Sequence, residues 1–177
     1  FAKELEKKAM LDPPLTELNV SGGTIKSIPD NINGLTKLKR LVAANNQIKY
    51  ISPNVSGLSA CMKLNLSNNR IQELPESISQ MNSLEELNLS VNRLKDLPRG
   101  FGNFQNLRVL DLSSNFLKAL PAQIGLLHTL EELLCSFNCL VTLPPEIGNC
   151  RRCTTLKLSN NYIETLPKEM GTIFKIP

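Results

Sequence analysis

Five cysteines are the side chains of this chain best suited to chemistry, because thiolates bind metal ions and attack electrophiles. They stand at positions 61, 135, 139, 150 and 153. Cys150 and Cys153 have the Cys-x-x-Cys spacing of many zinc sites, and Cys135 and Cys139 would complete a set of four ligands. The competing interpretation is that most of these cysteines fill a core as small hydrophobic side chains. Whether the cysteines bind a metal ion or fill the core depends on where the structural elements place their side chains.

Other catalytic chemistry has little support in the sequence. His128 is the only histidine, and there is no glycine-rich phosphate loop, no nucleophile elbow and no metal-binding pair of histidines. Glu85-Glu86 and Glu131-Glu132 are adjacent carboxylates, but such pairs more often form a solvated strand face than an acid–base pair. We therefore predict a protein that is not an enzyme, with no catalytic residue, no metal site and no cofactor.

The composition narrows the class of partner. The 20 basic and 16 acidic residues are mixed along the chain, and the net charge of +4 comes without a basic run or a basic strip with aromatic residues. No stretch approaches the roughly 20 apolar residues that span a bilayer. We expect no nucleic-acid partner and no membrane insertion.

A repeat of 23 residues organises nearly the whole chain. LNLSVNRLKDLP at Leu87–Pro98, LDLSSNFLKALP at Leu110–Pro121 and LKLSNNYIETLP at Leu156–Pro167 belong to seven consecutive units. The repeats occupy residues 15–175, and residues 176–177 would begin a further one. The seven units start at Leu15, Leu38, Cys61, Leu84, Leu107, Leu130 and Cys153.

Each unit predicts one strand and one turn. It reads approximately LxxLxLxxNxLxxLPxxIxxLxx, and apolar residues at its fourth and sixth positions alternate with polar ones, as in a strand with one buried face. Proline follows the fourteenth position in six units, and its fixed φ and missing N–H favour extended or 3₁₀ segments over long helices. These features predict an α/β repeat solenoid with seven parallel strands on its concave side and 3₁₀ turns on its convex side.

Asparagine occupies the ninth position of six units. Where the chain turns out of each strand, backbone groups would be buried unpaired, and an Asn side chain has the donors and the acceptor to satisfy them. We predict a structural ladder of Asn46, Asn69, Asn92, Asn115, Asn138 and Asn161.

Other asparagines form Asn-x-Ser triplets, the acceptor pattern for N-glycans. The triplets begin at Asn19, Asn54, Asn65 and Asn88. Three of them start at the fifth position, where the repeat itself supplies an apolar residue and Ser. We attribute the triplets to the repeat and not to glycosylation.

The unit resembles the leucine-rich repeat, and the resemblance covers Leu15 to Lys175. Its 23-residue LP-type form is similar to that of an intracellular family that includes the Ras suppressor protein, Shoc-type Ras scaffolds and the repeat region of yeast adenylate cyclase. Within this group, Asn92–Leu112 looks most like the Ras suppressor protein. The resemblance implies a leucine-rich repeat horseshoe and a cytoplasmic scaffold or adaptor that binds proteins, in Ras-related or adhesion signalling.

The repeat register favours the core interpretation of the cysteines. Cys61 and Cys153 stand at the first position, Cys135 at the sixth and Cys150 at the twenty-first, which are core positions of the unit. Cys139 stands at the tenth position and faces outward, so the four candidate ligands do not converge on one ion. The ends also lack the disulfide-paired caps of extracellular repeat proteins, which favours a reducing compartment.

Positions that the repeat leaves free carry the candidate partner-binding site. The tenth position forms a column across parallel strands about 4.8 Å apart, and the third, fifth and eighth positions add to it. Single exposed apolar residues are normal on any surface, but a cluster of them marks an interaction site. The predicted partner-binding residues are Arg40, Lys63, Arg70, Arg93, Val109, Phe116, Leu134, Phe137 and Tyr162.

Residues 1–14 precede the repeats. Phe1, Leu5 and Ala9 at i, i+4 and i+8 predict an amphipathic helix that ends before Asp12-Pro13-Pro14. We expect this helix to cap the first core edge of the solenoid, and a membrane-surface or partner-binding helix is the alternative.

The C-terminal end of the repeats carries apolar residues without a polar capping segment. Ile173 holds a core position, and Phe174 and Ile176 add apolar bulk. An open core edge exposes apolar surface and unpaired strand groups, so we expect it to be covered by more chain, by a second copy or by a partner, and we expect self-association through this edge.

Two functions of different classes fit the sequence. The first is a free-standing adaptor that binds a protein partner. The second is the targeting region of a larger signalling enzyme, such as a cyclase, kinase, phosphatase or Roco-type GTPase, whose catalytic part lies outside this chain. The full-length reading frame would distinguish them.

Overall fold

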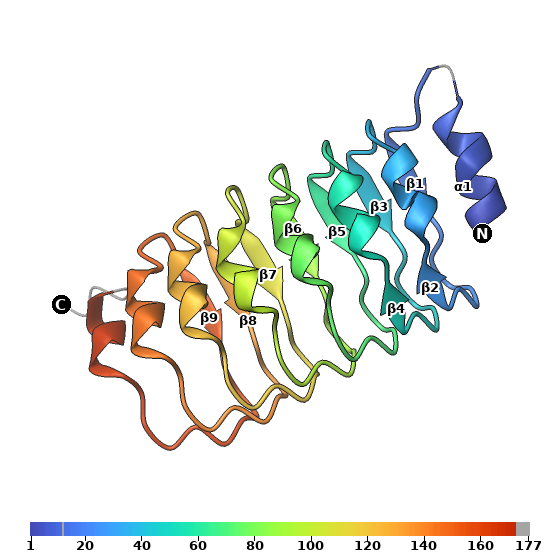
Figure 1. Cartoon of the computed structure of the whole chain (residues 1–177). Helices are drawn as coiled ribbons and strands as arrows, with labels where there is room; N and C mark the ends of the chain where they lie inside the picture. The colour runs from blue at the N-terminus through green and yellow to red at the C-terminus, as the bar shows by residue number, and fades with distance from the viewer. Residues whose placement is uncertain (12, 173–177) are drawn as a thin grey trace.

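The computed structural model describes residues 1–11 and 13–172 as a stack of similar turns (Figure 1). Seven short strands, one from each unit, form a single parallel sheet in the order β1-β3-β5-β6-β7-β8-β9, which confirms the predicted solenoid. The strands are β1 (Glu17–Asn19), β3 (Arg40–Val42), β5 (Lys63–Asn65), β6 (Glu86–Asn88), β7 (Val109–Asp111), β8 (Glu132–Leu134) and β9 (Thr155–Lys157).

The register of the sheet equals the repeat length. Leu41 lies opposite Leu64, and Leu64 lies opposite Leu87, so each strand pairs with the residues 23 positions further along the chain. Each repeat position therefore forms a column that runs along the stack from one end to the other.

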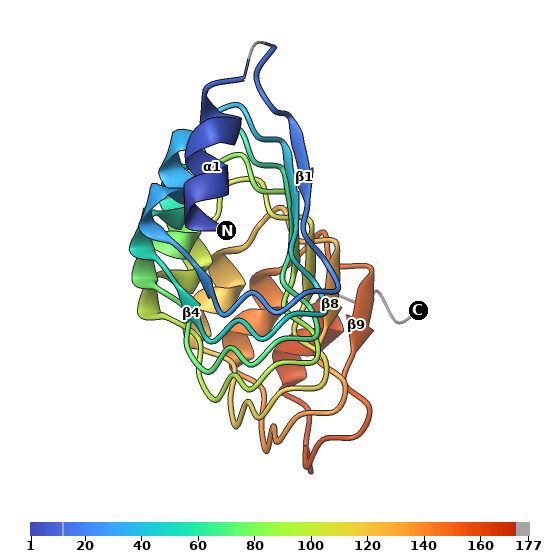
Figure 2. The ribbon, with the colours of Figure 1, turned by 90° about the vertical axis from the view of Figure 1, so that its right-hand side faces the viewer.

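A 3₁₀ helix forms the other side of each turn (Figure 2). Proline directly precedes six of these helices, all except η2, and at Pro75 it holds an extended backbone with φ −66° and ψ 143°. In the second unit Pro53 is itself the first helical residue, and the 3₁₀ helix occupies the same repeat positions as in the first unit. The helices are η1 (Asp30–Gly34), η2 (Pro53–Gly57), η3 (Glu76–Gln80), η4 (Arg99–Asn103), η5 (Ala122–Leu126), η6 (Pro145–Asn149) and η7 (Lys168–Thr172).

Two further strands join the first two units and were not predicted from the sequence. They are β2 (Ser27–Ile28) and β4 (Tyr50–Ile51), which pair in parallel immediately before η1 and η2. Ile28 and Ile51 are buried, so this small sheet also closes the core.

The core fills the space between the sheet and the 3₁₀ helices. Leu41, Leu64, Leu87, Leu110 and Leu133, all at the fourth position, are at most 2% exposed. Successive units thus stack identical side chains into one continuous hydrophobic column, which no single unit could bury alone.

Glycine at the nineteenth position lets neighbouring 3₁₀ helices approach closely. A Cβ atom at Gly102 would lie 2.2 Å from the carbonyl oxygen of Gln123, and one at Gly125 would lie 2.3 Å from that of Glu146. Both distances are shorter than any van der Waals contact, so the backbones of adjacent turns touch directly. At Gly171, in the seventh unit, no atom of the described residues lies within 4 Å of such an atom.

Helix α1 (Ala2–Ala9) lies beside η1 at the N-terminal end of the stack (Figure 1). Phe1 packs against the core, and the side-chain amide of Asn31 in η1 donates to the carbonyl oxygen of Ala2 over 2.7 Å. The predicted helix is present, and its role as a cap remains a prediction. No helix of the described part of the chain is long and apolar enough to cross a membrane.

The seventh unit is packed less completely than the inner units. Leu166 is 60% exposed and Leu156, Leu158, Ile163 and Met170 are partly buried, whereas the matching residues of the sixth unit are fully buried. The predicted apolar end residues Ile173, Phe174 and Ile176, and the start of a further repeat at 176–177, lie outside the described residues.

Candidate functional site

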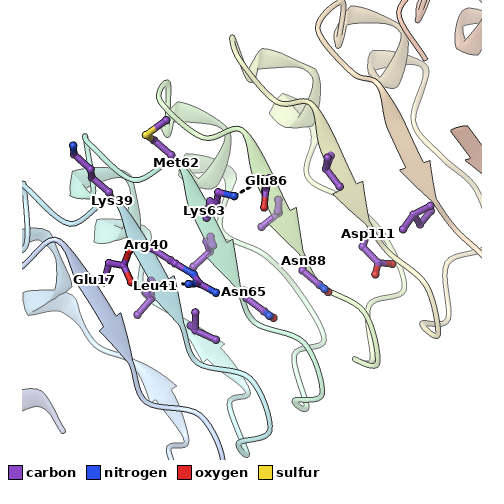
Figure 3. Close-up of a pocket in the computed structure, with 15 residues that line it drawn as sticks. Glu17, Lys39, Arg40, Leu41, Met62, Lys63, Asn65, Glu86, Asn88 and Asp111 are labelled. Carbon is purple, nitrogen blue, oxygen red and sulfur yellow. Dashed lines mark ion pairs between the residues drawn. The ribbon is translucent and has the colours of Figure 1, made fainter. Parts of the chain in front are cut away.

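A groove of about 550 Å³ runs across the open face of the sheet (Figure 3). We call it the concave groove. Its lining comes mainly from the third and fifth positions of the units, which lie on the strand face away from the core. The lining residues are Glu17, Lys39, Arg40, Leu41, Val42, Met62, Lys63, Leu64, Asn65, Glu86, Leu87, Asn88, Val109, Asp111 and Leu134.

Two ion pairs join neighbouring strands at the N-terminal end of the groove. Arg40 Nη1 lies 3.9 Å from Glu17 Oε2, and Lys63 Nζ lies 2.7 Å from Glu86 Oε1 (Figure 3). All four side chains are roughly half exposed or more, so each pair contributes little to stability. Arg40 and Lys63 can therefore exchange these partners for carboxylates of a bound protein at small cost.

The middle of the groove carries polar side chains that the backbone holds in place. The side-chain oxygens of Asn65, Asn88 and Asp111 accept hydrogen bonds of 2.9 Å from the backbone N–H of the residue two positions later. These bonds are Asx turns, which fix the side chains of three adjacent strands in a row. No bond within the described residues uses the amide nitrogens of Asn65 and Asn88, so both remain donors for a ligand.

The Asx turns explain the Asn-x-Ser triplets. Ser67 and Ser90 follow Asn65 and Asn88 at the spacing that an Asx turn requires, and the hydroxyl of Ser90 also donates to Asn88. The triplet is therefore a sequence signal for these groove residues.

The C-terminal end of the groove is apolar and has a stronger ion pair beside it. Val109 and Leu134 are half-buried in the lining. Next to them Arg108 binds Glu131 with two hydrogen bonds, Nε–Oε1 of 3.0 Å and Nη2–Oε2 of 2.8 Å. The hydrogen bond from Arg108 lowers the pKa of the Glu131 carboxyl and raises that of the guanidinium. This pair is satisfied and leaves the apolar residues as the contact surface.

The nine predicted partner-binding residues occupy two surfaces. Arg40, Lys63, Val109 and Leu134 line the concave groove. The other five stand at the eighth and tenth positions, after the strands, and are exposed outside the lining: Arg70, Arg93, Phe116, Phe137 and Tyr162.

The predicted asparagine ladder forms hydrogen bonds between units. The side-chain oxygen of Asn69 accepts from the backbone N–H of Ile48 in the preceding unit, and its nitrogen donates to the carbonyl oxygens of Ala43 and Leu66. The same bonds recur along the stack at Asn46, Asn92, Asn115, Asn138 and Asn161. These residues hold the groove strands in register and do not face a ligand.

Four cysteines are buried core residues, as the repeat register predicts. Cys61, Cys135, Cys150 and Cys153 have free thiols, and burial raises the pKa of each, to about 11 for Cys61 and Cys150. Cys139 is also free and is partly exposed. Within residues 1–11 and 13–172, no three His, Cys, Asp or Glu side chains form a metal-binding group.

Two models of leucine-rich repeats match the middle of the chain. The model described as "Leucine rich repeat" matches residues 54–94, and the model described as "Leucine Rich repeats (2 copies)" matches residues 82–125. No curated protein sequence matches the chain.

Solved structures with the same architecture match nearly the whole chain. The structure of a TLR13–ssRNA13 complex is 28% identical with a TM-score of 0.81, over 92% of this chain and 24% of the other. An internalin (inlF) from Listeria monocytogenes is 24% identical with a TM-score of 0.79, over 96% and 48%. A leucine-rich repeat protein from Leptospira interrogans is 26% identical with a TM-score of 0.57, over 98% and 55%. The chain thus spans about half of the latter two proteins.

Proposed function

We propose that this chain, which folds as a leucine-rich repeat solenoid, is a non-catalytic scaffold or adaptor that binds a protein partner in its concave groove. The observation that supports the proposal is that stacking and the groove use different side chains of each unit. Core leucines and ladder asparagines are used for stacking, while the groove presents charged, amide and apolar groups that the stacking does not need.

The groove chemistry suggests how a partner segment would lie. Lys39, Arg40 and Lys63 gather at one end, and Val109 and Leu134 lie at the other. A segment that carries carboxylates at one end and an apolar side chain at the other would match both, with the amides of Asn65 and Asn88 between them. Such a segment would displace the weak ion pairs of Arg40 and Lys63.

The LP-type form of the repeat suggests the cellular compartment and the signalling process in which the protein acts. We propose a cytoplasmic adaptor in Ras-related or adhesion signalling, in keeping with the sequence resemblance described above. Five free cysteines support a reducing compartment, because thiols in oxidising compartments are usually paired.

A second candidate is the targeting region of a larger signalling enzyme, such as a cyclase, kinase, phosphatase or Roco-type GTPase. This second candidate is retained because the chain spans only 24% to 55% of the lengths of the similar solved structures. Sequencing the complete transcript separates the two candidates, because only the second requires a catalytic domain in the same reading frame.

Self-association through the C-terminal edge is a further part of the proposal. The partly exposed core residues of the seventh unit support it, since a second copy could cover them. Leu166, in the seventh unit, is 60% exposed.

Affinity purification with mass spectrometry tests the groove. The intact chain is compared with the double variant Arg40→Ser, Lys63→Ser and with the control Arg151→Ser, Arg152→Ser, which removes two exposed charges outside the groove. We expect the groove variant to lose partners that the control retains. An identical set of partners for all three chains would show that the groove does not bind them.

A further inference from the structure

The turn at the eighth position of each unit has a left-handed backbone. Six non-glycine residues there have φ between 52° and 58°, and in the first unit Gly22 has φ 72°. Asn45, Asn68 and Asn160 suit this conformation, because asparagine tolerates positive φ better than most residues. Val91 and Phe137 do not, since β-branched and aromatic side chains disfavour it.

Neither Val91 nor Phe137 is compensated by packing. Val91 is 49% exposed and Phe137 is 59% exposed. Within the described part of the chain, the ring pair in contact is Phe101–Phe104 in the core, so the Phe137 ring has no aromatic neighbour. The fold gains little from these two side chains, and strained residues that the fold does not need are typical of functional surfaces.

Other exposed apolar residues lie in the adjoining units. Phe116 is 52% exposed and Tyr162 is 68% exposed, and both stand at the tenth position, two residues after the turn. Their backbone N–H groups donate to Leu94 and Leu140 in the preceding unit over 2.8 Å, which fixes them in the repeat register. We call Val91, Phe116, Phe137 and Tyr162 the flank strip, with one residue from each of units four to seven.

Basic residues lie beside the N-terminal half of the flank strip and extend one unit beyond it. Arg70 and Arg93 hold the tenth position in units three and four, and Lys95 and Lys118 hold the twelfth position in units four and five. All four are exposed, whereas the acidic residues beside them are Glu73 and Asp96. The basic residues thus lie in units three to five and the apolar strip in units four to seven, so positive charge gathers over the N-terminal part of the flank.

The spacing of the flank strip fits an α-helix. Adjacent parallel strands lie about 4.8 Å apart, so the strip advances by about 5 Å from one unit to the next, with its side chains alternating between the eighth and tenth positions. An α-helix rises about 5.4 Å per turn and presents one or two side chains of an apolar stripe in each turn. We propose that the flank strip binds an amphipathic helix of a partner protein, which lies along the stack and places acidic residues over Arg70 and Arg93.

Selection from a displayed library of helical peptides tests this proposal on the full chain. The library has a fixed helical frame, a randomised stripe at i, i+4, i+7 and i+11, and randomised ends. Binders are then measured by fluorescence polarisation against the intact chain, the variant Phe116→Ser, Phe137→Asn, and the control Leu126→Ser. Leu126 is 52% exposed on η5, so this control removes an apolar side chain of similar fractional exposure away from the flank.

We expect enriched helices with an apolar stripe and acidic residues at one end. The flank variant should bind them about tenfold more weakly or worse, and the control should bind them as the intact chain does. Because asparagine suits the left-handed turn, Phe137→Asn alone should not lower the thermal midpoint, so lost binding would not reflect unfolding. Reversal of charge at Arg70 and Arg93 to Glu should shift the selected ends from acidic to basic.

The proposal fails if no helix with such a stripe is enriched, or if the flank variant binds the enriched helices as tightly as the control. Two other classes of occupant are measured beside the library. Vesicles with phosphatidylserine, or single-stranded poly(U), would overturn the helix proposal if either bound to the flank strip in preference to every selected helix.

Discussion

The side-chain oxygen of Asn92 accepts a hydrogen bond from the backbone N–H of Ile71, 3.0 Å away in the preceding unit. Its nitrogen donates to the carbonyl oxygen of Leu66, also in the preceding unit, and to that of Leu89 in its own. One buried side chain thus satisfies backbone groups of two units at the point where both leave the sheet.

Asn92→Ala should therefore lower the free energy of unfolding by about 1–3 kcal/mol or more, because it leaves several buried backbone groups unpaired. The matched variant is Asn161→Ala, at the same position in the less buried seventh unit, where we expect a smaller loss. Urea denaturation measures both. Equal losses at the two sites would contradict the role of burial.

Val91→Asn should raise the free energy of unfolding by about 1 kcal/mol, because it relieves a β-branched residue with φ 55° and removes no buried contact. Ser114→Asn, at the same position of the next unit, is the control, and it should change stability less. The urea midpoints of both variants test this. Destabilisation by Val91→Asn would mean that the valine makes a contact the fold requires.

Gly125→Ala should destabilise the chain by about 1–3 kcal/mol or more, because the new Cβ atom would lie 2.3 Å from the carbonyl oxygen of Glu146. Gly171→Ala is the control at the same repeat position, and its Cβ atom meets no atom of the described residues within 4 Å. We expect a change within about 0.5 kcal/mol there. Thermal unfolding of the pair gives the comparison, and similar losses would rule out the steric explanation.

Stability should fall as the pH rises above 9. Burial raises the pKa of Cys61 and Cys150 from 9.0 to about 11, so both thiols remain protonated in the folded state where the unfolded chain has lost the proton. The stabilisation is complete below pH 9 and is lost as the pH rises to about 11. Urea midpoints across this range should decline less steeply for Cys61→Ala, Cys150→Ala than for the parent. Parallel curves would contradict the assignment.

The C-terminal edge should associate at high concentration. Sedimentation equilibrium should show a mass that rises with concentration, and Leu166→Lys should reduce the rise, because Leu166 is 60% exposed at this edge. Val141→Lys is the control, since Val141 is 57% exposed in the sixth unit. Hydrogen exchange should also find β9 less protected than β6. A strictly monomeric parent chain would show that the edge needs no cover.

The sequence predicted the repeating parts of the fold well, because repetition averages out local ambiguity. Leu64 and Leu87 stand at the same position of consecutive units, and a period of 23 allows one register for their strands. The 3₁₀ turns followed from proline, whose φ restriction acts regardless of its neighbours.

The repeat did not predict that the candidate binding residues lie on two separate surfaces. Alternation along a strand tells which side chains face the groove, but it holds only as far as the strand extends. The residue with a left-handed backbone at the eighth position ends the alternation. In unit four this residue is Val91 and in unit six it is Phe137, and neither residue type is typical of turns. Phe116 therefore looked continuous with Val109, although only Val109 lines the groove.

The glycine column on the convex side has a mechanical consequence. With Gly102 against the carbonyl oxygen of Gln123 and Gly125 against that of Glu146, the outer pitch of the solenoid is already at its backbone limit. The inner pitch is set by strand hydrogen bonds, so the arc between the two cannot flatten by compressing the outer turns. Bending that narrows the groove would have to spread the outer turns and give up those contacts. The solenoid is thus a stiff template, and a partner must supply the flexibility that a close fit requires.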